Sequence, residues 1–164
     1  MRTPLTLSNN ESVMLMRIRK DFPEFNADVA KQTVSGAVAE YFAVLSSGTG
    51  IEKLKGVCTA AFVNELDGIV QNGTYRYNDV KLHKTVICDY RKRADEAVIT
   101  YQTALEYALP NKALSQHICE TKYVYYLSQD SDGENASLIC QNCGAQINAS
   151  VERTWKVNAI NKTR

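Results

Sequence analysis

The sequence predicts an α+β domain in which N-terminal helices pack on a curved, mainly antiparallel sheet. Apolar residues recur with the period of a helix up to about residue 70, and they alternate with the period of a strand from Tyr75 onward. The chain has 164 residues, of which 45% are hydrophobic and 23% charged, as is ordinary for one globular domain. We therefore predict a flexible arm over residues 1–11 and a single domain over residues 12–164.

The first half of the chain is expected to be helical. A short apolar cluster between Val13 and Ile18 predicts a turn or two of helix ahead of Pro23, because proline disfavours helix in the residue before it. The longest helix should begin at Asn26 as its N-cap and end at Gly48. One face of this helix carries its apolar residues: Val34, Val38, Tyr41, Phe42 and Leu45.

Two further helices are expected before residue 73. Thr49 and Glu52 have the spacing of a capping box for a short helix that carries Ile51 and Leu54. The next helix should begin near Thr59 and end at Asn72-Gly73. Its apolar face holds Phe62, Val63, Leu66, Ile69 and Val70.

The second half of the chain alternates as strands do, and a charged turn at Arg91-Lys92-Arg93 joins the first two strands into a hairpin. The first strand is expected to be half-buried. Its apolar face should carry Val80, Leu82, Val86, Cys88 and Tyr90. Its polar face should largely carry Lys81, His83, Thr85 and Asp89. The second strand aligns Ala97, Ile99, Tyr101, Thr103, Leu105 and Tyr107, and the third aligns His117, Cys119, Thr121, Tyr123, Tyr125 and Leu127. A last strand is expected around Val151 to Ile160, with Trp155 and Val157. A helix layer across such a sheet tends to enclose a cone-shaped pocket.

The charge balance restricts the partners. Nineteen Lys and Arg residues against eighteen Asp and Glu residues give a formal net charge of +1, without the basic surplus typical of nucleic-acid binding. No apolar run approaches the roughly 20 residues needed to cross a bilayer. We expect no nucleic-acid partner, and a cytoplasmic or membrane-associated location is favoured. Peripheral contact with a membrane and a homodimer are both compatible with the sequence.

Cys140 and Cys143 form a CxxC motif followed by Gly144, a turn that directs two thiolates at one tetrahedral metal ion. These two residues are the candidate metal ligands, and zinc is the candidate metal. A structural zinc site needs four ligands, and the chain has no second CxxC. His117 with Cys119, or a second subunit, would have to supply the rest. The alternative is a pair of reduced thiols on a surface loop, with no cofactor.

The inward faces of the strands supply candidates for a pocket. These residues are Tyr101, Tyr107, His117, Tyr123 and Tyr125. They would give a pocket an aromatic lining with hydroxyl groups, and the alternative is that they fill the core. Glycine-rich phosphate loops, serine-centred elbows and HExxH motifs are absent from the sequence, so no catalytic constellation is predicted.

The pattern resembles the bacterial relatives of the C-terminal domain of the forty-four-kilodalton subunit of the mitochondrial inner-membrane translocase. The residues that carry the resemblance are Asp21-Phe22-Pro23-Glu24-Phe25, the charged strands after Tyr75, and Cys140-Gln141-Asn142-Cys143-Gly144-Ala145 with Ile147 to Ser150. Bacterial members often carry a second CxxC, which this chain lacks, so its zinc knuckle is degenerate. The resemblance implies a fold of the nuclear-transport-factor-2 and cystatin-like superfamily, whose cone pocket serves binding in some members and isomerase chemistry in others.

Three functions are compatible with these observations. The first is a non-catalytic binding or scaffolding domain that holds a protein segment or an apolar ligand, with a position at the membrane periphery left open. The second is a small pocket enzyme of the same superfamily, with His117, Tyr101 or Asp89 as acid-base groups. The third is a zinc-linked interaction module that uses Cys140 and Cys143.

Overall fold

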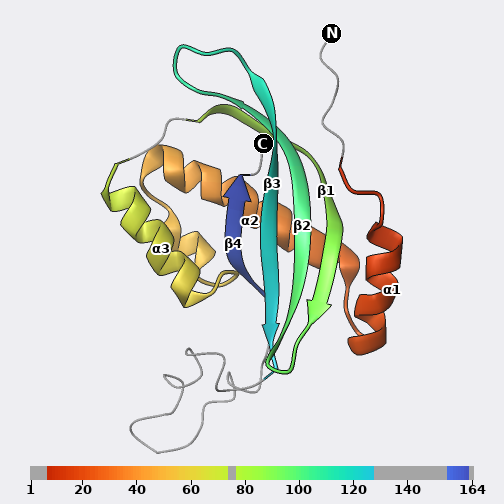
Figure 1. Ribbon diagram of the computed structural model, residues 1–164. Helices are drawn as coiled ribbons and strands as arrows, with labels where there is room; N and C mark the ends of the chain where they lie inside the picture. The colour runs from red at the N-terminus through yellow and green to blue at the C-terminus, as the bar shows by residue number, and fades with distance from the viewer. Residues whose placement is uncertain (1–6, 74–76, 128–154, 163–164) are drawn as a thin grey trace, which may run out of the picture.

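A computed structural model describes residues 7–73, 77–127 and 155–162. These residues form three α-helices, one 3-10 helix and four strands, which confirms the predicted α+β fold (Figure 1). The elements in chain order are α1 (Glu11–Asp21), α2 (Ala27–Ser47), η1 (Ile51–Leu54), α3 (Ala60–Gln71), β1 (Asn78–Lys92), β2 (Glu96–Ala108), β3 (Ser115–Tyr126) and β4 (Lys156–Lys162). None of the helices in the described ranges combines the length and apolar content that a membrane span requires.

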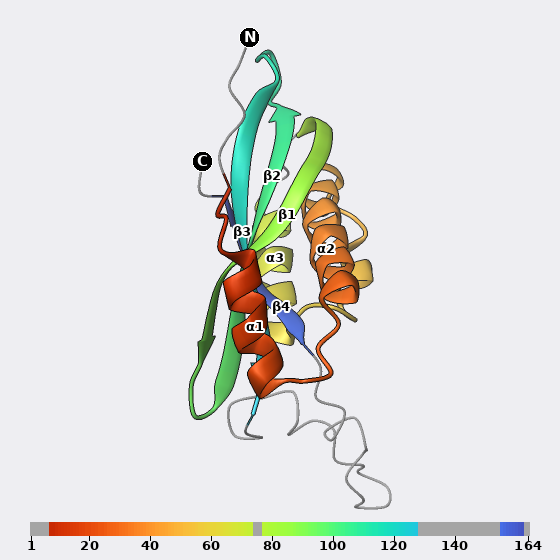
Figure 2. The same ribbon diagram turned by 90° about the vertical axis from the view of Figure 1, so that its right-hand side faces the viewer.

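The four strands make one antiparallel sheet in the order β1-β2-β3-β4. Helix α2 crosses one face of this sheet, α3 lies beside β4, and α1 lies at the β1 edge (Figures 1 and 2). Strands β2 and β3 pair without interruption from Glu96 and Tyr126 to Tyr107 and Ser115. This regular central pair keeps the inward side chains of β2 and β3 in strict alternation along both strands.

Helix α2 is the element that covers the sheet. The Asn26 side chain accepts a hydrogen bond from the Val29 N–H at 3.1 Å, and Gly48 ends the helix in the left-handed conformation with φ of 76°. Its predicted apolar face is buried at Val34, Val38, Phe42 and Leu45. Both ends and the buried face of the predicted helix are therefore confirmed.

The turn after α2 differs from the prediction. Residues 51–54 form a 3-10 helix whose N-cap is Gly50, at φ of 90°, and no side chain caps it. Thr49 instead lies 3.2 Å from the Ser47 hydroxyl. The predicted capping box of Thr49 and Glu52 is wrong because Gly50, which has no side chain to accept a hydrogen bond, is the N-cap in place of Thr49.

The inward face of β1 also differs from the prediction. Irregular pairing interrupts the strand between Leu82 and Lys84 and again between Ile87 and Asp89. Each irregularity changes which residues point inward. The core therefore takes Ile87 and Tyr90, while Thr85, predicted on the polar face, is buried against α2. Val86 is buried outside this core cluster.

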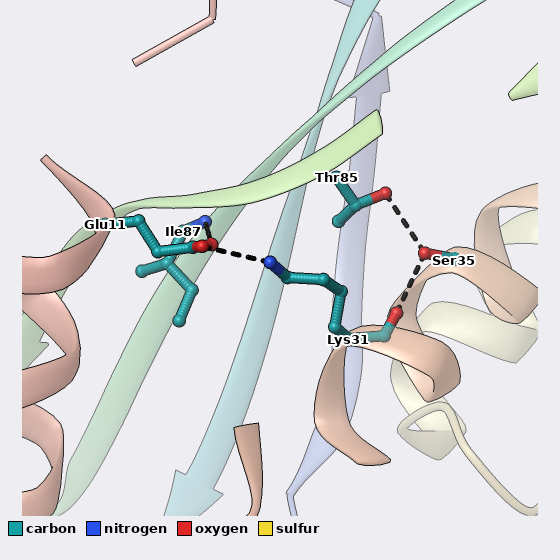
Figure 3. Close-up of polar contacts among 5 residues, drawn as sticks. All are labelled: Glu11, Lys31, Ser35, Thr85 and Ile87. Carbon is teal, nitrogen blue, oxygen red and sulfur yellow. Dashed lines mark hydrogen bonds and ion pairs between the residues drawn. The ribbon is translucent and has the colours of Figure 1, made fainter. Parts of the chain in front are cut away.

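The β1 edge is tied to both neighbouring helices (Figure 3). The Glu11 carboxylate accepts a hydrogen bond from the Ile87 N–H at 2.7 Å and lies 3.0 Å from the Lys31 ammonium on α2. The Ser35 hydroxyl donates to the Lys31 carbonyl at 2.8 Å and lies 3.0 Å from the Thr85 hydroxyl. These contacts fix α1 and α2 on the edge strand.

The β4 edge is also partly paired. The Val157 N–H donates to the Val57 carbonyl at 2.8 Å, and its carbonyl accepts from the Thr59 N–H at 2.9 Å. The Thr59 hydroxyl caps α3 and bonds to the Asn158 amide oxygen at 2.7 Å. The segment between η1 and α3 thus holds β4, and with it the adjacent Trp155.

Candidate functional site

An aromatic pocket opens between the end of the sheet and the linker that joins α1 to α2. Its volume is about 650 Å³. The lining consists of Asp21, Phe22, Pro23, Glu24, Phe25, Asn26, Val29, Ala30, Tyr123, Tyr125 and Trp155. Strand β3 ends and β4 begins at the lower end of the sheet in Figure 1, where α1 also ends. Three segments that are distant in sequence therefore meet at one cavity.

Trp155 is the central ring of the pocket. Its ring centroid lies 5.0 Å from that of Phe22 and 5.7 Å from that of Phe25, both edge to face. It lies 5.7 Å from Tyr123 in a stacked arrangement and 5.4 Å from Tyr125. Ring pairs at these separations are mutually stabilising. The half-buried Trp155 thus has fixed neighbours and still faces the cavity.

The polar part of the lining is acidic. Asp21 accepts a hydrogen bond from the Tyr90 hydroxyl at 2.7 Å, and its other oxygen lies 4.0 Å from the Lys92 ammonium. Glu24 is exposed, and no basic side chain in the described ranges lies within ion-pair distance of it. The Asn26 side chain is occupied in capping α2. Glu24 is therefore the carboxylate that a ligand can reach without displacing a partner.

The sequence-predicted pocket residues divide into two groups. Tyr123 and Tyr125 line the pocket. Tyr101 and Tyr107 are 0% and 1% exposed in the core, and the His117 ring stacks on Tyr107 with a centroid separation of 4.0 Å. Tyr101 and Tyr107 belong to the hydrophobic core, whereas His117 is half-buried against Tyr107, and none of the three lines the cavity.

The three acid-base candidates do not meet. Tyr101 pairs with Thr121 and His117 with Leu105, so the two lie four residues apart along β3, or about 13 Å. Asp89 pairs with Thr100, whose side chain points to the opposite face of the sheet from Tyr101. The His117 ring is within 2.7 Å of the Ser115 hydroxyl, and burial raises the pKa of Tyr101 above its ordinary value. This arrangement provides no shared acid-base site for the three groups.

Asp89 borders a second hollow, on the other face of the sheet. This hollow has a volume of about 330 Å³ and is lined by Asp89, Arg91, Arg93, Glu96, Val98, Thr100 and Lys122. Asp89 pairs with Arg91 at 3.0 Å, and Lys122 donates to the Thr100 hydroxyl at 2.8 Å. The charges in this hollow are mixed, and two of them, those of Asp89 and Arg91, form an ion pair.

The candidate metal ligands Cys140 and Cys143 lie outside the described residues. Within the described ranges, no group of three or more His, Cys, Asp or Glu side chains is placed to hold a metal ion. Cys119, considered as an additional ligand, is 0% exposed, and burial raises the pKa of its thiol to about 12. Its sulfur faces the core cluster rather than a surface loop.

Sequence reasoning missed three of the five rings that line the pocket within the described ranges. In the sequence analysis, Phe22 and Phe25 belong to the motif that carries the family resemblance, and Trp155 belongs to the last strand; none of the three is predicted to line a pocket. The available signal was a linker, Phe22-Pro23-Glu24-Phe25, with two aromatic residues where a polar turn is expected. Their partner at Trp155 is about 130 residues away in sequence, and no periodicity joins the two.

The comparison with solved structures finds proteins of similar fold, whereas the comparisons of sequence find none. No family model matches the chain, and no curated protein matches its sequence. Among solved structures, the chain is similar to the intermembrane space region of the chloroplast protein ARC6, with a TM-score of 0.49 and 15% sequence identity. The match covers 85% of this chain and 98% of that chain.

Proposed function

We propose that this chain is a non-catalytic binding or scaffolding domain that holds a segment of a partner protein in the aromatic pocket. The observation that carries the proposal is the pocket of about 650 Å³ lined by Phe22, Phe25, Tyr123, Tyr125 and Trp155. Concave sites lined mainly by aromatic groups with a few polar ones are typical binding sites. Large rigid rings also bind peptide side chains at a low entropic cost.

The chemistry of the lining favours binding over catalysis. Asp21 accepts a hydrogen bond from the Tyr90 hydroxyl, and the Asn26 side chain caps α2, so both polar groups already have structural partners. The acid-base candidates Tyr101 and His117 do not line the pocket. An enzyme would need a positioned acid, base or nucleophile beside the bound ligand.

The test uses intrinsic fluorescence, because Trp155 is the only tryptophan of the chain. The ligands are short alanine peptides with blocked ends that differ in one central residue: phenylalanine, leucine, arginine or glutamate. The proposal predicts saturable changes in Trp155 emission with at least one of these peptides. Saturable binding to none of them would contradict it.

A matched pair of variants locates the binding. Val29 lines the pocket and is 55% exposed, while Val13 on α1 is 56% exposed and does not line it. Val29→Phe fills part of the cavity and should weaken binding about tenfold, the loss expected when a well-packed contact is blocked. Val13→Phe should leave binding unchanged. Equal effects of the two substitutions would contradict binding in the pocket.

A further inference from the structure

The acidic rim and the ring faces of the aromatic pocket together define the side chain that it takes. We propose that the anchor residue of the partner segment is an arginine, whose guanidinium group stacks on the rings and pairs with Glu24. This inference rests on the proposed function and adds the chemistry of the ligand to it.

The rings provide the first argument. The faces of tryptophan and tyrosine rings carry negative charge density and attract cations that lie within about 6 Å of the ring centre. In the pocket, Trp155 stacks on Tyr123 and lies beside Tyr125, Phe22 and Phe25. The same chain already has one such contact, with the Arg17 guanidinium carbon 5.9 Å from the Tyr90 ring centroid.

The charges provide the second argument. The described part of the lining contains two carboxylates, Asp21 and Glu24, and no Lys, Arg or His. Asp21 is partly offset by Lys92, whereas Glu24 has no basic partner in the described ranges. A purely apolar anchor would leave this carboxylate unpaired at the mouth of the pocket. A cationic anchor would pair with it.

The helix ends do not reverse this preference. The C-terminal end of α1 and the N-terminal end of α2 both adjoin the linker over residues 22–26. A helix carries partial negative charge at its C-terminus and partial positive charge at its N-terminus, so the two ends offset each other. Asp28 in the first turn of α2, and Arg19 and Lys20 in the last turn of α1, place charges of complementary sign at these two ends, and none of the three lines the pocket.

Arginine fits the site better than lysine does. The guanidinium group is planar, stacks on aromatic faces and offers parallel N–H donors to a carboxylate. The lysine ammonium is compact and strongly hydrated, so it gains less from a wall of rings. Stacked rings beside an exposed carboxylate therefore match the guanidinium shape.

The decisive experiment compares four alanine peptides with blocked ends, whose central residue is arginine, citrulline, lysine or norleucine. Binding is measured through Trp155 emission. Citrulline keeps the shape of arginine and removes its charge. The arginine peptide should bind roughly tenfold more tightly than the citrulline and norleucine peptides, and more tightly than the lysine peptide.

Two variants connect the preference to the rim. Glu24→Gln should reduce the preference for arginine over citrulline several-fold, whereas Glu65→Gln, at an exposed site on α3, should leave it unchanged. Thermal unfolding of both variants checks that they remain folded. Equal binding of the citrulline or lysine peptide would overturn the arginine assignment and leave the proposed function standing. Absence of binding by every peptide, including those with apolar guests, would overturn both.

Discussion

The Glu11 carboxylate accepts a hydrogen bond of 2.7 Å from the backbone N–H of Ile87 in the edge strand β1. Because β1 is an edge strand of the sheet, an N–H group on its outer side has no partner strand, and that of Ile87 is available to α1. A carboxylate is a strong acceptor for an edge N–H, and it also blocks the pairing of another strand there. The contact therefore satisfies the strand edge and fixes α1, whose last residue, Asp21, is part of the pocket lining.

Removal of this carboxylate should be more costly than removal of its ionic partner. Glu11→Ala leaves the Ile87 N–H without its acceptor and should lower the free energy of unfolding by about 1–3 kcal/mol. Lys31→Ala removes an ion pair whose side chains are 36% and 30% exposed and should cost less than about 1 kcal/mol. Urea unfolding measures both, with Glu65→Ala as the surface control. Equal losses for Glu11→Ala and Lys31→Ala would contradict this assignment.

Two buried tyrosines should respond in opposite ways to loss of the hydroxyl group. The Tyr90 hydroxyl donates to Asp21 at 2.7 Å, so Tyr90→Phe should lower the free energy of unfolding by about 1.5 kcal/mol. The buried Tyr101 hydroxyl has no hydrogen-bond partner among the described residues. Tyr101→Phe should therefore leave stability unchanged or raise it by up to about 1 kcal/mol. A loss for Tyr101→Phe as large as that for Tyr90→Phe would show that its hydroxyl is bonded.

The segment that holds β4 depends on one hydroxyl group. The Thr59 hydroxyl caps α3 by accepting a hydrogen bond from the Phe62 N–H at 3.2 Å. It donates a second hydrogen bond to the side-chain amide oxygen of Asn158 at 2.7 Å. Thr59→Ala should lower stability by about 1–2 kcal/mol, while Thr59→Ser should retain most of it. Thr49→Ala is the control, because Thr49 caps no helix and should change stability by less than about 0.5 kcal/mol. Similar losses at the two threonines would restore the predicted capping box.

The buried thiols predict a loss of stability at high pH. Burial raises the pKa of Cys58 and Cys119 to about 12 from 9.0, and that of Cys88 to about 11. Their protonated forms are favoured in the folded state, so this stability is complete below pH 9 and is lost as the pH rises through 11 to 12. Each thiol contributes a slope of up to about 1.4 kcal/mol per pH unit. Unfolding measured between pH 8 and 11 in a non-thiol reductant should show the decline, and Cys119→Ala should reduce its slope.

Local signals predicted the helices and the central strands. The cap at Asn26, the apolar face through Val34 and Leu45, and the stop at Gly48 all lie within one segment, so the sequence contains the whole explanation of α2. The alternation from Ala97 to Tyr107 likewise survives unchanged in β2, because its pairing with β3 is regular.

The inward face of β1 and the walls of the pocket depend on tertiary contacts, which local sequence signals do not reveal. The irregular pairings in β1 bring Ile87 inward. Its N–H donates to Glu11, a residue 76 positions earlier that no local pattern connects to the strand. The pocket is a similar case. Tyr123 and Tyr125 were predicted as pocket residues from strand alternation, but the walls formed by Phe22, Phe25 and Trp155 depend on how three distant segments come together.

The most direct test of the binding account is chemical-shift mapping by NMR with the peptide that binds most tightly. The single indole N–H resonance, from Trp155, identifies the pocket without sequence assignment. The account predicts that this resonance shifts most during the titration, together with the backbone amide resonances of Phe22 and residues 24–30. An unchanged Trp155 indole resonance with shifts concentrated around Arg91 and Lys122, on the other face of the sheet, would contradict it.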